Sequence, residues 1–398
     1  MTRIHVPGKN CVVLNDPDVI ADVLIHKTDD YWRDRPRGAV LPVATDDSAF
    51  ISPGGNHWAE RRAWHPQQHE GIDAWLDARV QGLVPVIQQT LERWVDKGAQ
   101  EASDVVNRLT CDLLFAASYD GGPVSDDEYD LFMQVATALD SRMQWRWPFR
   151  KPIWGAEQKA YDDWQSAGEV RFDAQTDEGS LPEIMRKAAL LDKPSRMARG
   201  MNAVLLEGGF SSGSGISSTL WQLTQHPDEA KKVADAVAAL PRPLTWKSID
   251  ACEPLDHALR EAMRILPPVP IFFRNSTKER NIELGGYELP PNTVLFVTNW
   301  LLQRESDHWE DPSEFRPSRW ENGVAAANPY GSGHFSPFGR GPRSCAGERL
   351  ALLVQKTALA VLLSEGSIEV GKGQGEQQLG FFFATLRMDN TSLIAKKR

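Results

Sequence analysis

The sequence predicts a mostly helical fold, in one domain with a small β portion. Apolar residues recur at helical spacing over most of the 398 residues, and prolines end several of these stretches. Short strand patterns gather over residues 271–299 and again near the C-terminus, in FFFATLRM. Because no internal repeat or low-complexity linker divides the chain, we expect a single domain over residues 1–398.

Composition excludes several classes of protein. Hydrophobic residues make up 41%, charged residues 25%, and no apolar run reaches the roughly 18 residues of a membrane span. A net charge of −10 argues against nucleic-acid binding. The four cysteines are widely spaced without a CxxC pair, and the start of the chain lacks a signal peptide, so we expect a cytoplasmic protein with no membrane segment.

The first half of the chain predicts one strand and a series of helices. Residues 10–27 predict a strand, a turn and an amphipathic helix, and the Pro and Gly content of residues 33–55 predicts a loop. Helical periodicity then recurs up to residue 190, with an interruption around WPFRKPIW at 147–154. The predicted helices cover residues 56–70, 74–98, 100–118, 126–145 and 155–190.

The second half predicts one long helix, a strand region and a final helix. The long helix covers residues 195–226 and ends at a proline, as does the next helix, at about 248–266. Short strands alternate with turns over 271–299, and a Pro-rich irregular segment extends to about residue 344. The last helix, residues 346–365, precedes a small β region.

A loop that carries one cysteine to the start of a helix is predicted at FSPFGRGPRSCAGERL, residues 335–350. Its glycines permit a tight turn with close approach of the backbone to a ligand. Loop N–H groups and the helix N-terminus would stabilise a thiolate at Cys345, and Arg343 is placed to meet an anionic group on the same ligand. A buried free cysteine would explain Cys345 alone, but not the pattern around it.

Within this loop, FGRGPRSCAG resembles the haem-binding signature F-x-x-G-x-R-x-C-x-G of the cytochrome P450 family. The resemblance implies the cytochrome P450 fold and heme b (iron protoporphyrin IX) as the cofactor, with the Cys345 thiolate as the ligand to the iron. The loop residues implied to bind the cofactor are Phe338, Gly339, Arg343, Cys345 and Gly347, with Gly341 filling the other fixed glycine position.

A second signature lies upstream of the cysteine loop. Glu261 and Arg264 in HALREAMRILPP are three residues apart, so they share one face of a helix. Such a pair is usually an exposed surface pair that contributes little. Together with Arg319 in FRPSRW, however, it resembles the structural Glu-Arg-Arg network of the family.

Weaker matches concern the haem propionates. His57 and Arg61 in GNHWAERRAWHP fit the family's H-x-x-x-R pattern, and Arg274 corresponds to another arginine that binds a propionate. Taken alone, each also fits an ordinary surface charge. The family's first helix and strand, ahead of the strand near Cys11, have no counterpart, so either the start lies upstream or this member is shortened.

The centre of the long helix departs from the family pattern. Alignment on His226 and Pro227 places Phe210 where the family has an acid and Ser211 where it has threonine. The resemblance assigns that pair to proton delivery, a general-acid role that phenylalanine cannot fill. Ser211 keeps a hydroxyl, and Glu207 lies nearly one turn away as an unassigned acid. Proton delivery is therefore expected to use substrate groups or ordered water.

Four glycines at the centre of the same helix also need an explanation. Each costs roughly 1 kcal/mol relative to alanine in a helix. We expect close approach to a flat cofactor, or a local kink that holds water, to compensate. These glycines are residues 208, 209, 213 and 215.

The family layout implies an apolar substrate pocket rich in phenylalanine. Such a pocket favours a hydrophobic or aromatic ligand, although an aromatic run is more often part of an ordinary core. The implied wall residues are Val40, Leu41, Phe50, Phe210, Val269, Ile271, Phe272, Phe382 and Phe383.

The resemblance implies a haem-thiolate monooxygenase that uses dioxygen on a hydrophobic small molecule, free or tethered to a carrier, in bacterial specialised metabolism. Electrons are expected from a separate ferredoxin or flavodoxin with its reductase, docked near Arg340, Arg343 and Arg349. Two alternatives stay open. One is a peroxygenase, isomerase or dehydratase that needs no acid at Phe210, and the other is a haem-based binding or sensor protein.

Overall fold

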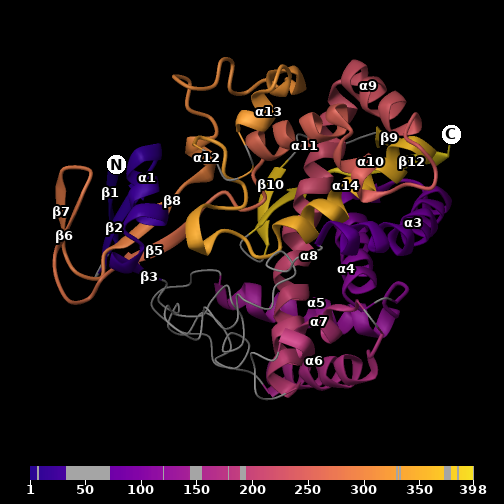
Figure 1. The fold of residues 1–398 in the computed structure, drawn as a ribbon, viewed down its shortest axis with the longest axis horizontal. Coiled ribbons are helices and arrows are strands. Elements are labelled where there is room, and N and C mark those ends of the chain that lie inside the picture. The colour runs from indigo at the N-terminus through magenta and orange to yellow at the C-terminus, as the bar shows by residue number, and fades with distance from the viewer. Residues whose placement is uncertain are drawn as a thin grey trace.

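The computed structural model confirms a mainly helical architecture with a small β portion (Figure 1). A five-stranded sheet lies at one side of the molecule, and the helices pack together beside it. The structure describes residues 1–6, 9–32, 72–119, 121–143, 155–177, 179–188, 194–328, 330, 333–371, 378–382 and 385–397. No helix in these ranges is both long enough and apolar enough to cross a bilayer.

The main sheet joins the N-terminus to a segment almost 300 residues later. Its strand order is β1-β2-β8-β5-β3, and the central pair is parallel, with Cys11 of β2 opposite Val294 of β8. Strand β1, ahead of the predicted strand at residues 10–14, was not expected from the sequence. The strands are β1 (Thr2–Val6), β2 (Lys9–Leu14), β3 (Tyr31–Trp32), β5 (Phe272–Ser276) and β8 (Val294–Val297).

Three smaller sheets complete the β portion. The first is the hairpin β6 (Ile282–Leu284) and β7 (Tyr287–Leu289), and the second is the pair β10 (Gln378–Phe382) and β11 (Thr385–Asp389). The third sheet has the order β4-β12-β9. Its strands are β4 (Gln100–Glu101), β9 (Gly366–Val370) and β12 (Ser392–Lys397).

Helix α8 (Pro194–Gln225) forms the centre of the helical part, and α4, α6, α11 and α14 pack around it (Figure 1). The large hydrophobic core lies among these helices, and a smaller core lies against the main sheet. The other α-helices are α1 (Pro17–Ala21), α3 (Ile72–Lys97), α4 (Ala102–Tyr119), α5 (Asp126–Met143), α6 (Gly155–Ala174), α7 (Leu181–Ala188), α9 (Pro227–Ala238), α10 (Trp246–Asp250), α11 (Glu253–Ile265), α12 (Asn299–Leu302), α13 (Val324–Ala327) and α14 (Glu348–Glu365).

Three helix boundaries differ from the prediction. The helix expected at 155–190 divides into α6 and α7, because Gly179 adopts a left-handed backbone (φ 81°) between them. The helix expected at 248–266 divides into α10 and α11. Pro227 ends α8 but also begins α9. Proline is tolerated at the first position of a helix, because a backbone N–H there would have no hydrogen-bond acceptor within the helix. The helix expected at 56–70 lies outside the described residues.

The glycines of α8 face neighbouring helices. A Cβ atom at Gly209 would lie 3.1 Å from the Phe132 ring of α5, and one at Gly215 would lie 2.4 Å from Oε1 of Gln355 on α14. Gly208 and Gly213 approach α4 in the same way. Close helix packing therefore compensates for their low helix propensity, and α8 continues through all four positions without a break.

Candidate functional site

The cysteine loop closes on itself through three backbone hydrogen bonds. Cys345 N–H donates to Phe338 O at 2.7 Å, Gly339 N–H to Ser336 O at 2.9 Å, and Ser344 N–H to Gly341 O at 2.9 Å. Helix α14 begins three residues after Cys345, at Glu348. The loop thus holds Cys345 next to a helix N-terminus, as the sequence predicts.

Gly341 adopts a conformation and position that only glycine permits. Its φ of 69° is left-handed, and a Cβ atom there would lie 1.9 Å from the carbonyl oxygen of Leu24. Leu24 belongs to η1 (Asp22–His26), a π-helical turn that follows α1. This glycine therefore permits a close approach to the backbone of the N-terminal segment.

Cys345 is the exposed member of the four cysteines, none of which forms a disulfide bond. The other three are buried, and burial raises the pKa of Cys11, Cys111 and Cys252 above that of an ordinary thiol. A thiolate is the form that ligates a metal. Cys345 is therefore the thiol available to an external ligand.

Behind the loop, Glu261 and Arg264 form a fully buried ion pair rather than a surface pair. Two hydrogen bonds of 2.9 Å join Arg264 Nε and Nη2 to the Glu261 carboxylate. Arg319, in η4 (Pro317–Trp320), donates from Nε to Glu261 Oε1 at 2.9 Å, and Trp320 Nε1 donates to Oε2 at 2.9 Å. The three residues that the sequence groups therefore meet, and Trp320 is a fourth member.

Gln303 connects this network to the cysteine loop. Arg264 Nη1 donates to the Gln303 carbonyl oxygen at 3.0 Å, and the Gln303 side chain accepts from Ser336 N–H at 3.2 Å. The Ser336 hydroxyl in turn donates to Asn299 Oδ1 at 3.2 Å. No local pattern marks Gln303 in the sequence, because Arg264 and Ser336 lie more than thirty residues away on either side.

Phe210 lies at the centre of an aromatic stack. It is 3% exposed and stacks on Phe132 of α5 at 5.3 Å between ring centroids, with an interplanar angle of 20°. Its other neighbour is Phe382 of β10, edge-on at 4.9 Å. Two residues of the predicted pocket wall thus contact each other, and Phe210 is a packed ring between α5 and β10. Ser211 donates from Oγ to the carbonyl oxygen of Glu207 at 3.1 Å.

The remaining predicted site residues lie on or next to β5, or outside the described residues. Arg274 is 3% exposed, and its Nη1 donates to Phe273 O at 3.0 Å. Val269 and Phe272 are half-buried and Ile271 is exposed. The predicted residues outside the described ranges are Val40, Leu41, Phe50, His57, Arg61 and Phe383.

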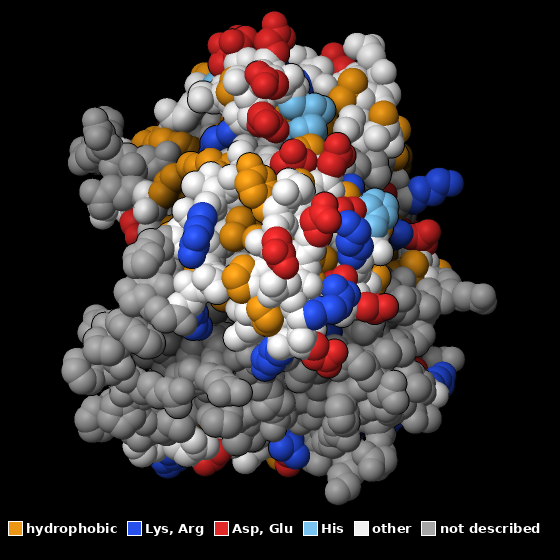
Figure 2. Space-filling model, turned by 90° about the vertical axis from the view of Figure 1, so that its left-hand side faces the viewer, with side chains coloured by type: hydrophobic (Ala, Val, Ile, Leu, Met, Phe, Trp, Pro, Cys, Tyr) orange, Lys and Arg blue, Asp and Glu red, His pale blue; other side chains and the backbone are white. Residues whose placement is uncertain are grey.

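The arginines proposed to meet a redox partner are partly engaged within the chain. Arg349 forms an ion pair with Asp73, and burial lowers the pKa of Arg340. On the face drawn in Figure 2, Lys and Arg side chains are interspersed with Asp and Glu. Within the described ranges, no cluster of three or more His, Cys, Asp or Glu side chains could hold a separate metal ion.

One family model matches the second half of the chain. Residues 200–387 match the family model described as Cytochrome P450, and this range contains the centre of α8, the Glu261 network and the cysteine loop. This part of the chain is similar to the cytochrome P450 family.

Curated cytochromes P450 from animals and plants resemble the chain. Cytochrome P450 4V2 of Mus musculus is 28% identical over 61% of this chain and 47% of its own length. Cytochrome P450 93A3 of Glycine max is 34% identical over 49% of this chain and 37% of its own. Lithocholate 6-beta-hydroxylase of Mesocricetus auratus is 31% identical over 48% of this chain and 38% of its own length. The chain thus spans less than half the length of these relatives.

Cytochromes P450 hold their haem through a cysteine thiolate. The residues present fit that group: one exposed thiol stands on a glycine loop ahead of a helix, and the three other thiols are buried. Phe338 and Gly347 flank Cys345 as the signature requires. A buried cation, Arg274, suits a propionate.

Proposed function

We propose that the protein is a haem-thiolate monooxygenase that oxidises a hydrophobic or aromatic small molecule. The observation that carries this proposal is the exposed Cys345 on its signature loop, with the buried Glu261 network behind it. The bound haem would supply activation of dioxygen. One oxygen atom enters the substrate, and two electrons and two protons reduce the other to water.

The protein's own residues bind and orient the cofactor in this proposal. Cys345 supplies the thiolate, and the loop's N–H groups and the N-terminus of α14 stabilise its charge. Arg343 and Arg274, with His57 and Arg61, hold the propionates.

The substrate is proposed to be apolar because phenylalanines gather at the centre of α8. Phe210 and Phe382 contact each other there, and Phe272, Val269 and Ile271 belong to the same predicted wall. Lithocholate 6-beta-hydroxylase, a relative, is named for a hydroxylation of a largely apolar molecule. Shape and apolar contact would then select the substrate, free or carrier-tethered, with few polar contacts.

Electrons are proposed to come from a ferredoxin or flavodoxin with its reductase. Such partners are acidic, so Arg340, Arg343 and Arg349 would provide a small basic docking area whose effect falls with ionic strength. Four cysteines without a disulfide bond fit a reducing compartment, such as a bacterial cytoplasm, and the setting we propose is specialised metabolism.

One observation favours a second candidate, a haem-thiolate enzyme that uses peroxide or performs no oxygenation. Phe210 fills the acid position with a buried ring, and the Ser211 hydroxyl already donates to Glu207 O. A reaction that starts from peroxide needs fewer protons from the protein. An isomerase, a dehydratase or a non-enzymatic sensor needs no delivery of protons to bound oxygen.

Product analysis with isotopically labelled dioxygen separates these candidates. First, the ferric haem protein is titrated optically with apolar and aromatic compounds, and those that shift the spin state are kept. A surrogate ferredoxin with its reductase then supplies electrons under labelled dioxygen. One labelled atom in the product supports the monooxygenase, whereas product formed only with peroxide supports the peroxygenase. Product formed without either oxidant supports an isomerase or a dehydratase, whereas binding without any product contradicts both candidates and supports the sensor.

A further inference from the structure

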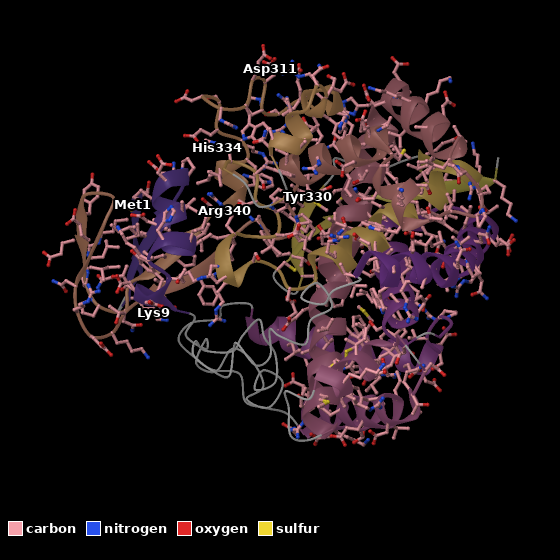
Figure 3. All side chains as sticks on the ribbon, in the orientation of Figure 1. Met1, Lys9, Asp311, Tyr330, His334 and Arg340 are labelled. Carbon is pink, nitrogen blue, oxygen red and sulfur yellow. The ribbon has the colours of Figure 1, made fainter. Side chains whose placement is uncertain are left out.

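A second buried polar network lies beside the Glu261 network, with Asp256 of α11 at its centre. Tyr330 donates from its hydroxyl to Asp256 Oδ1 at 2.9 Å, and Lys356 Nζ lies 2.8 Å from the same oxygen. Arg260 Nε donates to Asp256 Oδ2. Tyr330 is 5% exposed, and Figure 3 shows it in the interior of the helical part. None of these residues lies in the cysteine-loop signature or in the Glu261 network.

This network reaches both sides of the cysteine loop. On the upstream side, the Tyr330 ring contacts the Phe338 ring edge-on at 5.6 Å, and Phe338 O accepts the N–H of Cys345. On the downstream side, Lys356 lies in α14, the helix that begins three residues after Cys345. One carboxylate on α11 therefore fixes the segment that enters the loop and the helix that leaves it.

Arg260 strengthens the upstream contact. Its guanidinium lies over the Tyr330 ring at 4.0 Å, and its Nη1 donates to the carbonyl oxygen of Asn328 at 2.9 Å. The cation–π contact thus holds the Tyr330 ring, and the hydrogen bond holds the backbone two residues before it. The Tyr330 hydroxyl donates to Asp256, and this hydrogen bond sets the rotation of the Tyr330 ring against the Phe338 ring.

The charges of the network are compensated inside the protein. Burial alone raises the pKa of the Asp256 carboxyl, but Lys356 and Arg260 outweigh it, so the pKa lies below its ordinary value. Asp250 also accepts a hydrogen bond from Lys356 Nζ at 2.6 Å. Burial raises the pKa of Tyr330 well above the ordinary value, so its phenol stays a neutral donor. A charge-assisted hydrogen bond between Tyr330 and Asp256 follows, which is stronger than a neutral one.

We propose that Tyr330 and Asp256 are positioning residues for the haem ligand: their hydrogen bond fixes Phe338, and through Phe338 O it fixes the backbone of Cys345. The proposal deepens the proposed function, because the residue positioned is the iron ligand. The effect on the backbone of the cysteine loop can be measured without substrate turnover.

Hydrogen exchange of the Cys345 amide tests the proposal in the purified full-length protein. Tyr330→Phe removes one hydroxyl and leaves the ring. Because a hydrogen bond to a charged group is lost, we expect about tenfold faster exchange of this amide. Asp256→Asn, which keeps the shape of the side chain and removes its charge, is expected to act in the same direction. Tyr287→Phe is the matched control, since Tyr287 is 66% exposed on β7.

A second readout follows the haem itself. In Tyr330→Phe we expect a shifted reduction potential and a larger fraction of the ferrous carbonyl complex without the thiolate signature. A merely structural role would accelerate exchange equally along α11 and α14 and leave the potential of the folded protein unchanged. Either that pattern, or Cys345 exchange equal to that of Tyr287→Phe, overturns the proposal. A wild-type protein without a thiolate signature would instead contradict the proposed function, while faster exchange in Tyr330→Phe would still support the positioning role.

Discussion

At the scale of single residues, the cysteine loop depends most on glycine at position 341. A side chain there would meet the Leu24 carbonyl oxygen, which belongs to the backbone and cannot rotate away. The loop and the N-terminal segment are therefore locked together at this point. Loss of that contact would displace the loop that presents Cys345.

Gly341→Ala is expected to lower haem occupancy and to destabilise the protein by about 1–3 kcal/mol more than a control that shares its backbone strain. Gly286→Ala is that control. Gly286 also has a positive φ, of 79°, but no atom lies within 4 Å of the position of its Cβ. Denaturant unfolding and the ratio of haem to protein absorbance measure the two effects. Equal behaviour of the two variants would show that the contact with Leu24 is unimportant.

The sequence predicted some residues of the site and missed others, for a physical reason. Cys345, Phe338 and Arg343 lie within eight residues, so a fixed local spacing reveals them. Tyr330 and Asp256 are 74 residues apart and meet only after α11 and the loop have folded. No periodicity encodes such a pair.

At the scale of elements, α8 is the helix around which the proposed pocket residues Phe210 and Phe382 pack. Its aromatic stack joins α5 and β10 through Phe210, and its small residues admit α4 and α14. The length and end of α8 were predictable from periodicity and Pro227. Its partners were not, because Phe132 carries no distinguishing pattern within α5.

Phe210→Ala is expected to destabilise the protein by about 3–5 kcal/mol, since it removes a buried ring that contacts two others. It should also weaken binding of aromatic compounds in the optical titration. Phe381→Ala serves as the control, because Phe381 neighbours Phe382 on β10 but is 57% exposed. If both variants lost the same stability, the stack would have no special part in holding β10 against α8.

The contact between α6 and α8 supplies another comparison. A Cβ atom at Gly168 of α6 would lie within 2.5 Å of three side-chain atoms of Asn202, a fully buried residue of α8 that donates to Trp164 O. We expect Gly168→Ala to destabilise the protein by about 1–3 kcal/mol.

Gly82→Ala is the matched helical control, because nothing lies within 4 Å of its Cβ position in α3. It is expected to stabilise by up to about 1 kcal/mol through helix propensity. Thermal unfolding of both variants measures the difference. A stabilising effect at both glycines would contradict the packing described for α6 on α8.

At the scale of the whole molecule, two buried charge networks connect α11 to the segments before and after the cysteine loop. Glu261 joins α11 to η4, and Asp256 joins it to Tyr330 and α14. The first network was predictable from a known spacing. The second was not. The main sheet likewise depends on the pairing of β2 with β8, which only the folded chain reveals.

The Asp256 network predicts a pH-dependent stability. Because its pKa is lower in the folded state than the ordinary 3.8, Asp256 stabilises the fold above that pH, and the contribution is lost as pH falls through the lowered value. Asp256→Asn is therefore expected to destabilise by about 3–5 kcal/mol near neutral pH, and by less in acid. Urea unfolding at neutral pH and at acid pH measures the loss of stability, and the exposed Asp307→Asn variant is the control. A pH-independent effect would exclude the charge as its cause.

In the proposed function Cys345 supplies the thiolate that holds the haem, and the absorption spectrum of the reduced carbonyl complex tests this role. The wild-type protein and Cys252→Ala, which loses a thiol elsewhere, are expected to give the red-shifted band of a thiolate-ligated haem. Cys345→Ser is expected to lose that band. A red-shifted band that persists in Cys345→Ser, or that is missing from haem-loaded wild-type protein, would contradict the account.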